Sequence, residues 1–237
     1  MAMSNAQRRS KKAARRKAVL VEKRKAEISG NTVLAQMLRA AGGPIVHCKM
    51  HEDLFESGMG MLIVVRGTPG DTVMCGFLLD VFCLGIKGTD VRPVTMGEAE
   101  FFLDAYGDAA PMKSVEPAYA CKLLRDLASW AEAIGFSPAR DYDVAMRIFG
   151  DNDPDTCDAT FSFGHKGKPR YMPGPTDTPS DVRRRVERLQ QRLGADGFEF
   201  VLDEESLLAA KEVTETLLLE GAARDLPSPE ESSPRPA

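Results

Sequence analysis

The chain of 237 residues lacks the sequence patterns that identify most enzymes and membrane proteins. It has no dinucleotide-binding glycine fingerprint, no serine-hydrolase elbow, no zinc-protease pair of histidines and no kinase motif set. No apolar run approaches the roughly 20 residues that a membrane helix needs. The start is not a basic stretch followed by an apolar core and a cleavage site, so we expect no signal peptide. We therefore expect no cofactor and no membrane association.

Cysteine is also scarce. The five cysteines are an odd number, and their spacing does not match a metal site. Cys75, Cys83 and Cys121 lie among apolar residues, where a thiol behaves as a small hydrophobic group. This pattern predicts a protein of the reducing cytoplasm without a disulfide framework. We accordingly expect a cytoplasmic location and no metal.

Positive charge is abundant only at the start of the chain. Residues 1–25 hold ten Lys and Arg against one acid, Glu22, and carry +9, whereas the whole chain carries −4. The remaining residues therefore carry −13. The Ala-rich, charged composition at the start of the chain leads us to expect a disordered basic arm over residues 1–27. The ten cations are Arg8, Arg9, Lys11, Lys12, Arg15, Arg16, Lys17, Lys23, Arg24 and Lys25.

A basic arm on an acidic protein is typical of binding to polyanions. We expect the ten cations to be nucleic-acid-binding residues that contact RNA or the ribosome. The arm has no aromatic residue, so contacts to phosphate should outweigh base stacking. Two alternatives remain open. The arm is a solubilising tail, or it docks on the acidic body of its own chain.

The first half of the body is rich in strand patterns. A helix is expected over residues 31–43, with apolar positions at Leu34, Met37 and Leu38. A hairpin turn is expected around Pro69 and Gly70. The expected strands cover residues 44–51, 60–66, 72–87 and 91–95, the last at a sheet edge because Pro93 has no amide hydrogen.

The second half has mostly helical periodicity. In the helix expected to start at Ser114, an apolar stripe is formed by Leu123, Leu124, Leu127, Ala131 and Ile134. A second hairpin is expected from residues 159–163 and 168–172, and a last strand from 198–202. The expected helices cover residues 96–107, 114–135, 141–150, 178–194 and 203–221. The pattern predicts an α+β fold, a mostly antiparallel sheet packed by three to four helices in a single domain over 28–220, with a disordered Pro- and Ser-rich tail over 221–237.

One charged residue interrupts the most apolar stretch. In a continuous strand over 75–84 both faces would be apolar, which predicts a central strand covered on both sides. Asp80 would then be a carboxylate on a covered face, which is costly without a partner. Lys87 could reach it only if the chain reversed near Gly85, and we expect no reversal that sharp. The favoured interpretation is that Asp80 lies near a sheet end and is bonded by backbone amides or an arginine.

Three further clusters resemble functional sites, and each also has a simpler structural explanation. His47, Cys48 and His51 could suggest a metal site, but the segment is predicted to be extended. The sequence DNDPD at 151–155 begins like a calcium loop yet lacks the later ligands, so an Asx-capped turn is favoured. The segment 164–171 groups lysines and glycines without phosphate-loop spacing, so a solvated turn is favoured over a basic hairpin tip that contacts phosphate.

Three segments together resemble a family of uncharacterised bacterial proteins. They are GFLLDVFCLGIK at 76–87, FGDNDPDTC at 149–157 and FSFGHKGKPRYMPGPTD at 161–177. The resemblance covers roughly residues 44–202 and implies no activity. The positions to which it points are Asp80, Cys83, Gly85, Lys87, Gly167, Lys168, Pro169, Gly174, Pro175 and Asp177.

The hypothesis that follows is a non-enzymatic cytoplasmic adaptor that binds RNA or ribosomes through its arm. The alternative is a hydrolase or nuclease-like enzyme in which Asp80, Lys87, Lys168 and Asp177 converge as catalytic residues. Perturbed charged groups in a concave pocket would favour that alternative. A backbone-capped Asp80 with solvent-directed lysines would count against it.

Overall fold

The structure is a computed structural model that describes residues 33–201 of the chain. The described residues fall into two compact units, one ending at Pro169 and the other beginning at Arg170. The expected single domain over 28–220 stays a prediction. The predicted α+β class and mostly antiparallel sheet are confirmed. The predicted arm, the helix over 203–221 and the tail lie outside the described residues.

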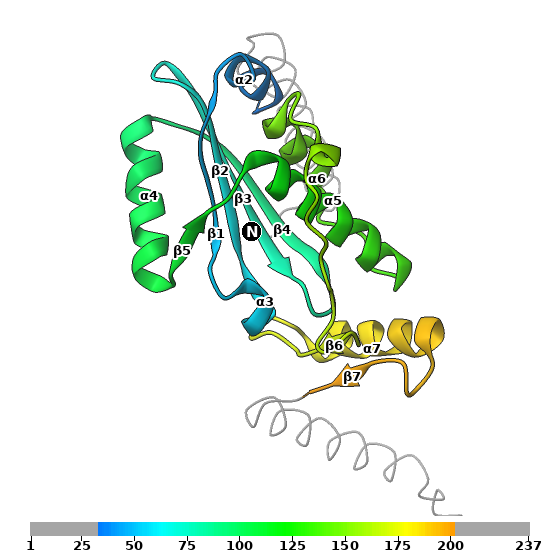
Figure 1. Cartoon of the computed structure of the whole chain (residues 1–237). Helices are drawn as coiled ribbons and strands as arrows, with labels where there is room; N and C mark the ends of the chain where they lie inside the picture. The colour runs from blue at the N-terminus through cyan, green and yellow to red at the C-terminus, as the bar shows by residue number, and fades with distance from the viewer. Residues whose placement is uncertain (1–32, 202–237) are drawn as a thin grey trace, which may run out of the picture. The chain divides into compact units, whose positions relative to one another are not determined.

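The first unit is built on a five-stranded antiparallel sheet with the order β4-β3-β2-β1-β5 (Figure 1). The four strands β1 to β4 follow one another both in sequence and in space. The predicted edge position of Pro93 is confirmed, because it lies in the outer strand β4. The strands are β1 (Ile45–His51), β2 (Met59–Thr68), β3 (Asp71–Asp80), β4 (Gly85–Val94) and β5 (Met112–Ser114).

The expected long strand over 72–87 is wrong. The chain reverses at residues 81–84, so that β3 ends at Asp80 and β4 begins at Gly85, directly opposite Asp80 in the register. Gly85 has a φ of +71°, a conformation that glycine adopts at little cost. The reversal was hidden because residues 81–84 are as apolar as the strand and are themselves largely buried.

Both faces of the sheet are covered in the first unit. The main core lies on the side of α5 (Pro117–Ala133) and includes Leu62, Phe77 and Leu79. The opposite face packs Ile63 and Met74 against α4 (Met96–Ala109). Figure 1 shows α4 and α5 on opposite sides of the strands. The prediction of a central, doubly covered strand over 75–84 is therefore confirmed for residues 75–80, whereas residues 81–84 form the reversal.

The helices of the first unit follow the predicted apolar stripes, with local differences. All five stripe residues of α5 are buried, as predicted, but the N-cap is Glu116 and Ser114 belongs to β5. In α2 (Val33–Ala40), Met37 is buried whereas Leu38 is 63% exposed. Within residues 33–169 the remaining helical elements are α3 (Leu54–Ser57), α6 (Tyr142–Ala145) and the 3-10 turns η1 (Met146–Phe149) and η2 (Pro154–Thr156).

The second predicted hairpin is wrong. Residues 158–163 run extended without a strand partner among the described residues, and the only link across the tip is an isolated bridge between His165 and Lys168. Phe161 and Phe163 nevertheless alternate with the exposed Thr160 and Ser162, as in a strand. The alternation reflects packing on one side only.

The second unit contains one helix and one small sheet within residues 170–201. Its strands β6 (Arg170–Tyr171) and β7 (Glu199–Phe200) pair in parallel. Its helix α7 (Pro179–Leu193) begins with the predicted capping box, in which the side chain of Thr178 accepts from the amide of Asp181 and the side chain of Asp181 accepts from the amide of Thr178. Tyr171 is fully buried and Leu189 is the buried residue of α7.

Candidate functional site

Asp80 is held by the backbone of the reversal that follows it. Its Oδ1 accepts hydrogen bonds from the amides of Phe82 at 3.1 Å and Cys83 at 2.8 Å. Only 5% of the residue is exposed. Burial raises the pKa of Asp80, although these amides and the charge of Lys87 act in the opposite direction. The expected position at a sheet end with backbone donors is confirmed.

Lys87 lies near Asp80 because the chain reverses, contrary to expectation. Its charge helps to lower the pKa of Asp80, yet no ion pair joins the two among the described residues. The Nζ atom of Lys87 instead lies 3.9 Å from the Sδ atom of Met59 on β2. The charge of Lys87 thus acts on Asp80 without an ion pair between the two side chains within the described residues.

Asp177 belongs to the second unit and is engaged there. Its Oδ2 accepts from the amide of Gly174 at 3.0 Å and from the hydroxyl of Tyr171 at 3.2 Å, and it pairs with Nη1 of Arg185 at 2.5 Å. Arg185 also donates to the Tyr171 hydroxyl, at 3.1 Å. This network ties the loop containing Pro175 to the start of the unit, which gives Asp177 a structural role.

The turn between His165 and Lys168 carries the remaining basic candidates. Lys166 and Gly167 are exposed at its tip, and Lys166 adopts a φ of +53°. Lys168 is partly exposed. Lys168 lies in the first unit and Asp177 in the second, so the four residues of the enzyme hypothesis are divided between the units.

The histidines of β1 do not form a joint site. His47 and His51 lie on the same strand face but four residues apart, which separates them by roughly 13 Å. No group of three potential metal-ligating side chains gathers within residues 33–201.

The acidic loop at 151–155 forms the predicted turn. The side chain of Asp153 accepts from the amide of Asp155 at 2.9 Å, which is an Asx cap of η2. Asp155 pairs with Nη1 of Arg125 at 2.7 Å. These contacts give the loop a structural explanation.

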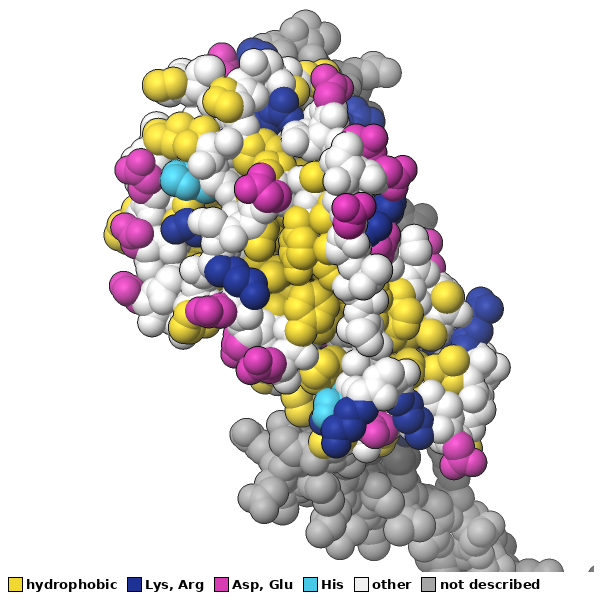
Figure 2. Space-filling view, viewed as in Figure 1, with side chains coloured by type: hydrophobic (Ala, Val, Ile, Leu, Met, Phe, Trp, Pro, Cys, Tyr) yellow, Lys and Arg dark blue, Asp and Glu magenta, His cyan; other side chains and the backbone are white. Residues whose placement is uncertain are grey.

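An aromatic cluster that sequence reasoning missed lies on the first unit. The rings of Phe55 and Phe161 are nearly parallel, with centroids 6.1 Å apart, and Tyr119 packs edge-on against Phe161 at 5.1 Å. Phe163 continues the row, 5.5 Å from Trp130. Figure 2 shows hydrophobic side chains gathered in a band down the middle of the face in view. The rings come from α3, α5 and the extended residues 158–163, so no local pattern in the sequence predicts that they meet.

Three rings of this cluster, Phe55, Tyr119 and Phe161, line a surface hollow of about 550 Å³, which we call the aromatic hollow. Its three partly exposed rings stand beside two hydroxyl side chains and the tip of the basic turn. It is lined by Phe55, Tyr119, Thr160, Phe161, Ser162, Gly164, Lys166 and Gly167. Rings, hydroxyls and one exposed cation suit a flat, polar-edged ligand better than they suit bond-breaking chemistry.

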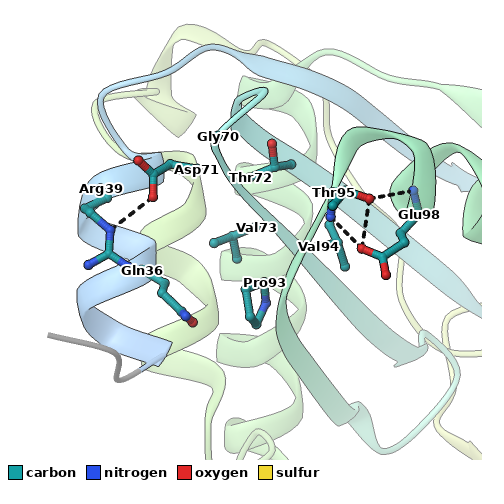
Figure 3. Close-up of a pocket in the computed structure, with 10 residues that line it drawn as sticks. All are labelled: Gln36, Arg39, Gly70, Asp71, Thr72, Val73, Pro93, Val94, Thr95 and Glu98. Atoms are coloured by element: carbon teal, nitrogen blue, oxygen red, sulfur yellow. Dashed lines mark hydrogen bonds and ion pairs between the residues drawn. The ribbon is translucent and has the colours of Figure 1, made fainter. Parts of the chain in front are cut away.

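A second hollow, of about 390 Å³, lies where α2 meets the β2–β3 turn and the start of α4 (Figure 3). Its charged groups already have partners. Nε of Arg39 lies 3.1 Å from Oδ1 of Asp71, and Thr95 and Glu98 form a reciprocal capping box. Its polar groups are explained by local structure.

Comparison with known proteins identifies no relative. No family model, no curated protein and no solved structure matches the chain. The resemblance to a bacterial family therefore stays a prediction. None of the helices within residues 33–201 combines the length and the apolar character that a membrane crossing needs. The ten cations of the arm lie outside the described residues.

Proposed function

We propose that this protein is a non-enzymatic, cytoplasmic adaptor that associates with RNA or the ribosome by binding the phosphate backbone through its basic arm. The observation that carries the proposal is the division of charge, +9 in the first 25 residues against −13 in the remainder. Cations gathered in one segment displace the counterions of a polyanion, whereas the acidic remainder repels it. Contact with RNA should therefore be concentrated in the arm.

A binding role for the body is supported by its candidate catalytic carboxylates, which are already engaged in structural contacts. Asp80 and Asp177, the two carboxylates of the enzyme hypothesis, are occupied by backbone amides and by Tyr171 and Arg185. The observation that favours the alternative, a hydrolase or nuclease-like activity, is the raised pKa of Asp80 near Lys87. That observation is also explained by burial alone, so we retain the adaptor as the conclusion.

The test is RNA binding over a salt series. We would compare the full chain with a full-length variant in which all ten arm cations are replaced by Gln, using a labelled single-stranded RNA. The full chain should show a logarithmic salt slope of about −0.7 for each phosphate contacted, which for ten contacts is roughly −7. The Gln variant should lose this slope and most of the affinity.

A control separates charge content from charge position. Ten Lys or Arg residues of the body replaced by Gln would lower the net charge equally while leaving the arm intact. Equal loss of binding in both variants, or no binding by the unmodified chain, would refute the proposal.

A further inference from the structure

The aromatic hollow offers two kinds of contact at once. Phe55, Tyr119 and Phe161 present partly exposed ring surface, and the exposed Lys166 lies at the same hollow. Aromatic rings stack on bases of any sequence, and a lysine contacts phosphate as a point charge. Asp53 and Glu56 lie close to Phe55 in the chain, and their negative charge repels phosphate. A phosphate contact is therefore expected at Lys166, not beside Phe55.

The rim of the hollow also carries a backbone segment without hydrogen-bond partners in the described part of the chain. Residues 158–163 make no backbone hydrogen bond to any residue of the described range 33–201. The side chains of Thr160 and Ser162 point to solvent on the same segment. Amide, carbonyl and hydroxyl groups are the donors and acceptors that the polar edge of an unpaired base requires.

We propose that the aromatic hollow binds an unpaired nucleobase of single-stranded RNA, with the base against the Phe55 and Phe161 rings, its polar edge toward residues 160–162 and its phosphate toward Lys166. This inference rests on the proposed function and adds the form of RNA that is selected. In a duplex the bases are stacked inside and their pairing edges are occupied, so the hollow cannot use them. The arm, which contacts phosphate, has no such preference.

The first experiment measures the preference for single strands. The full chain is titrated into a labelled 12-nucleotide oligouridylate and into an RNA duplex of the same length at fixed salt. Phe161→Leu keeps an apolar side chain and removes the ring, so binding to oligouridylate should weaken about 10-fold while duplex binding is unchanged. Phe101→Leu is the matched control, because Phe101 is 69% exposed on α4 and is not part of the hollow.

The second experiment concerns the phosphate contact. Lys166→Gln should lower the magnitude of the salt slope by about one contact on oligouridylate, and Lys113→Gln, at an exposed lysine of β5, should not. The single tryptophan, Trp130, packs on Phe163 in the same row of rings. Unchanged Trp130 emission therefore shows that each variant is folded around the hollow.

The outcomes distinguish the two proposals. If the full chain binds neither RNA, the proposed function fails and this inference fails with it. If RNA binds through the arm but folded Phe161→Leu and Lys166→Gln behave like the unmodified chain, only the hollow proposal is overturned. An extended alternating Val-Thr peptide that binds the full chain, with no effect of Phe161→Leu on RNA, would assign the hollow to strand addition and overturn the nucleobase.

Discussion

The carboxylate of Asp80 stays buried because the chain that follows it turns back and supplies donors. The amides of Phe82 and Cys83 bond to one of its oxygens, and the register places Gly85 opposite it. A carboxylate in this position organises the reversal between β3 and β4. The sequence correctly indicated a sheet end with backbone partners, since an unpartnered charge in so apolar a stretch would be too costly.

The pKa of Asp80 predicts how stability depends on pH. Burial raises this pKa above its ordinary 3.8, so the folded chain holds the proton more tightly than the unfolded chain does. The contribution of Asp80 to the free energy of unfolding is therefore greatest at low pH. It falls as the pH rises from about 3.8 through the raised folded pKa and is level above it.

Asp80→Asn tests this, because it keeps the accepting oxygen and cannot ionise. Its stability relative to the unmodified chain should rise with pH and level off, as measured by urea unfolding between pH 3 and pH 8. Asp80→Ala leaves two amides without an acceptor and should be about 2 kcal/mol less stable than Asp80→Asn at every pH, because neither side chain ionises. A stability difference for Asp80→Asn that falls with rising pH would contradict the raised pKa.

At the scale of elements, apolar periodicity locates strands and helices well and reversals poorly. The stripe of α5 and the capping box of α7 were predictable, because each depends on residues close together in sequence. The turn at 81–84 was not, since its buried residues make contacts distant in the chain: the amide of Val81 donates to Gly58, and its carbonyl accepts from the amide of Gly164. The expected hairpin around GHKG failed for the same reason: alternation records one-sided burial, not the presence of a strand partner.

Gly85 is the position where this reversal is most sensitive to substitution. A residue with a Cβ would have to keep the φ of +71° found at Gly85. Its Cβ would lie 2.4 Å from Cβ of Ala131 on α5. Gly85→Ala should therefore lower the free energy of unfolding by about 2–4 kcal/mol. Urea unfolding followed by Trp130 emission would measure it.

Two further variants make the interpretation specific. Gly97→Ala in α4, where an added Cβ meets nothing within 4 Å, should be neutral or stabilise by up to about 1 kcal/mol. Adding Ala131→Gly to Gly85→Ala should recover the part of the lost unfolding free energy that comes from the close contact with Cβ of Ala131. The part that comes from the positive φ at residue 85 should remain. Equal effects of Gly85→Ala and Gly97→Ala would show that the close approach to Ala131 is unimportant.

At the scale of the whole molecule, the division of charge was visible in the sequence and the aromatic hollow was not. The net charge of a segment requires only counting, whereas Phe55, Tyr119 and Phe161 are brought together by folding across more than one hundred positions. Composition even argued against stacking, because the arm has no aromatic residue. A site assembled from three elements is recognisable only once the elements are placed.

The five thiols report on the integrity of the whole fold. Four are buried and Cys157 is partly exposed. Burial raises the pKa of Cys48 to about 12, and burial likewise raises the pKa of Cys75 and Cys121. We expect one thiol per chain to react quickly with a disulfide reagent at pH 8, and the others only as the fold opens.

Cys157→Ser provides the control for this count, because it should abolish the fast phase and leave the slow phase unchanged. In denaturant all five thiols should react at one rate. Two or more fast thiols in the native chain would contradict the packing of the core around Cys48, Cys75, Cys83 and Cys121.

The neighbour-to-neighbour order of β1 to β4 also has a consequence for how the chain acquires its structure. Each of these strands pairs with the one before it, so the ladders over residues 45–94 close over short loops and carry a small entropic cost. During synthesis these ladders can zip before α5 has left the ribosome. The apolar face of the sheet with Phe77 and Leu79 then stays exposed to solvent until residues 117–133 are synthesised and pack on it. During this interval the nascent chain is most prone to associate with other chains.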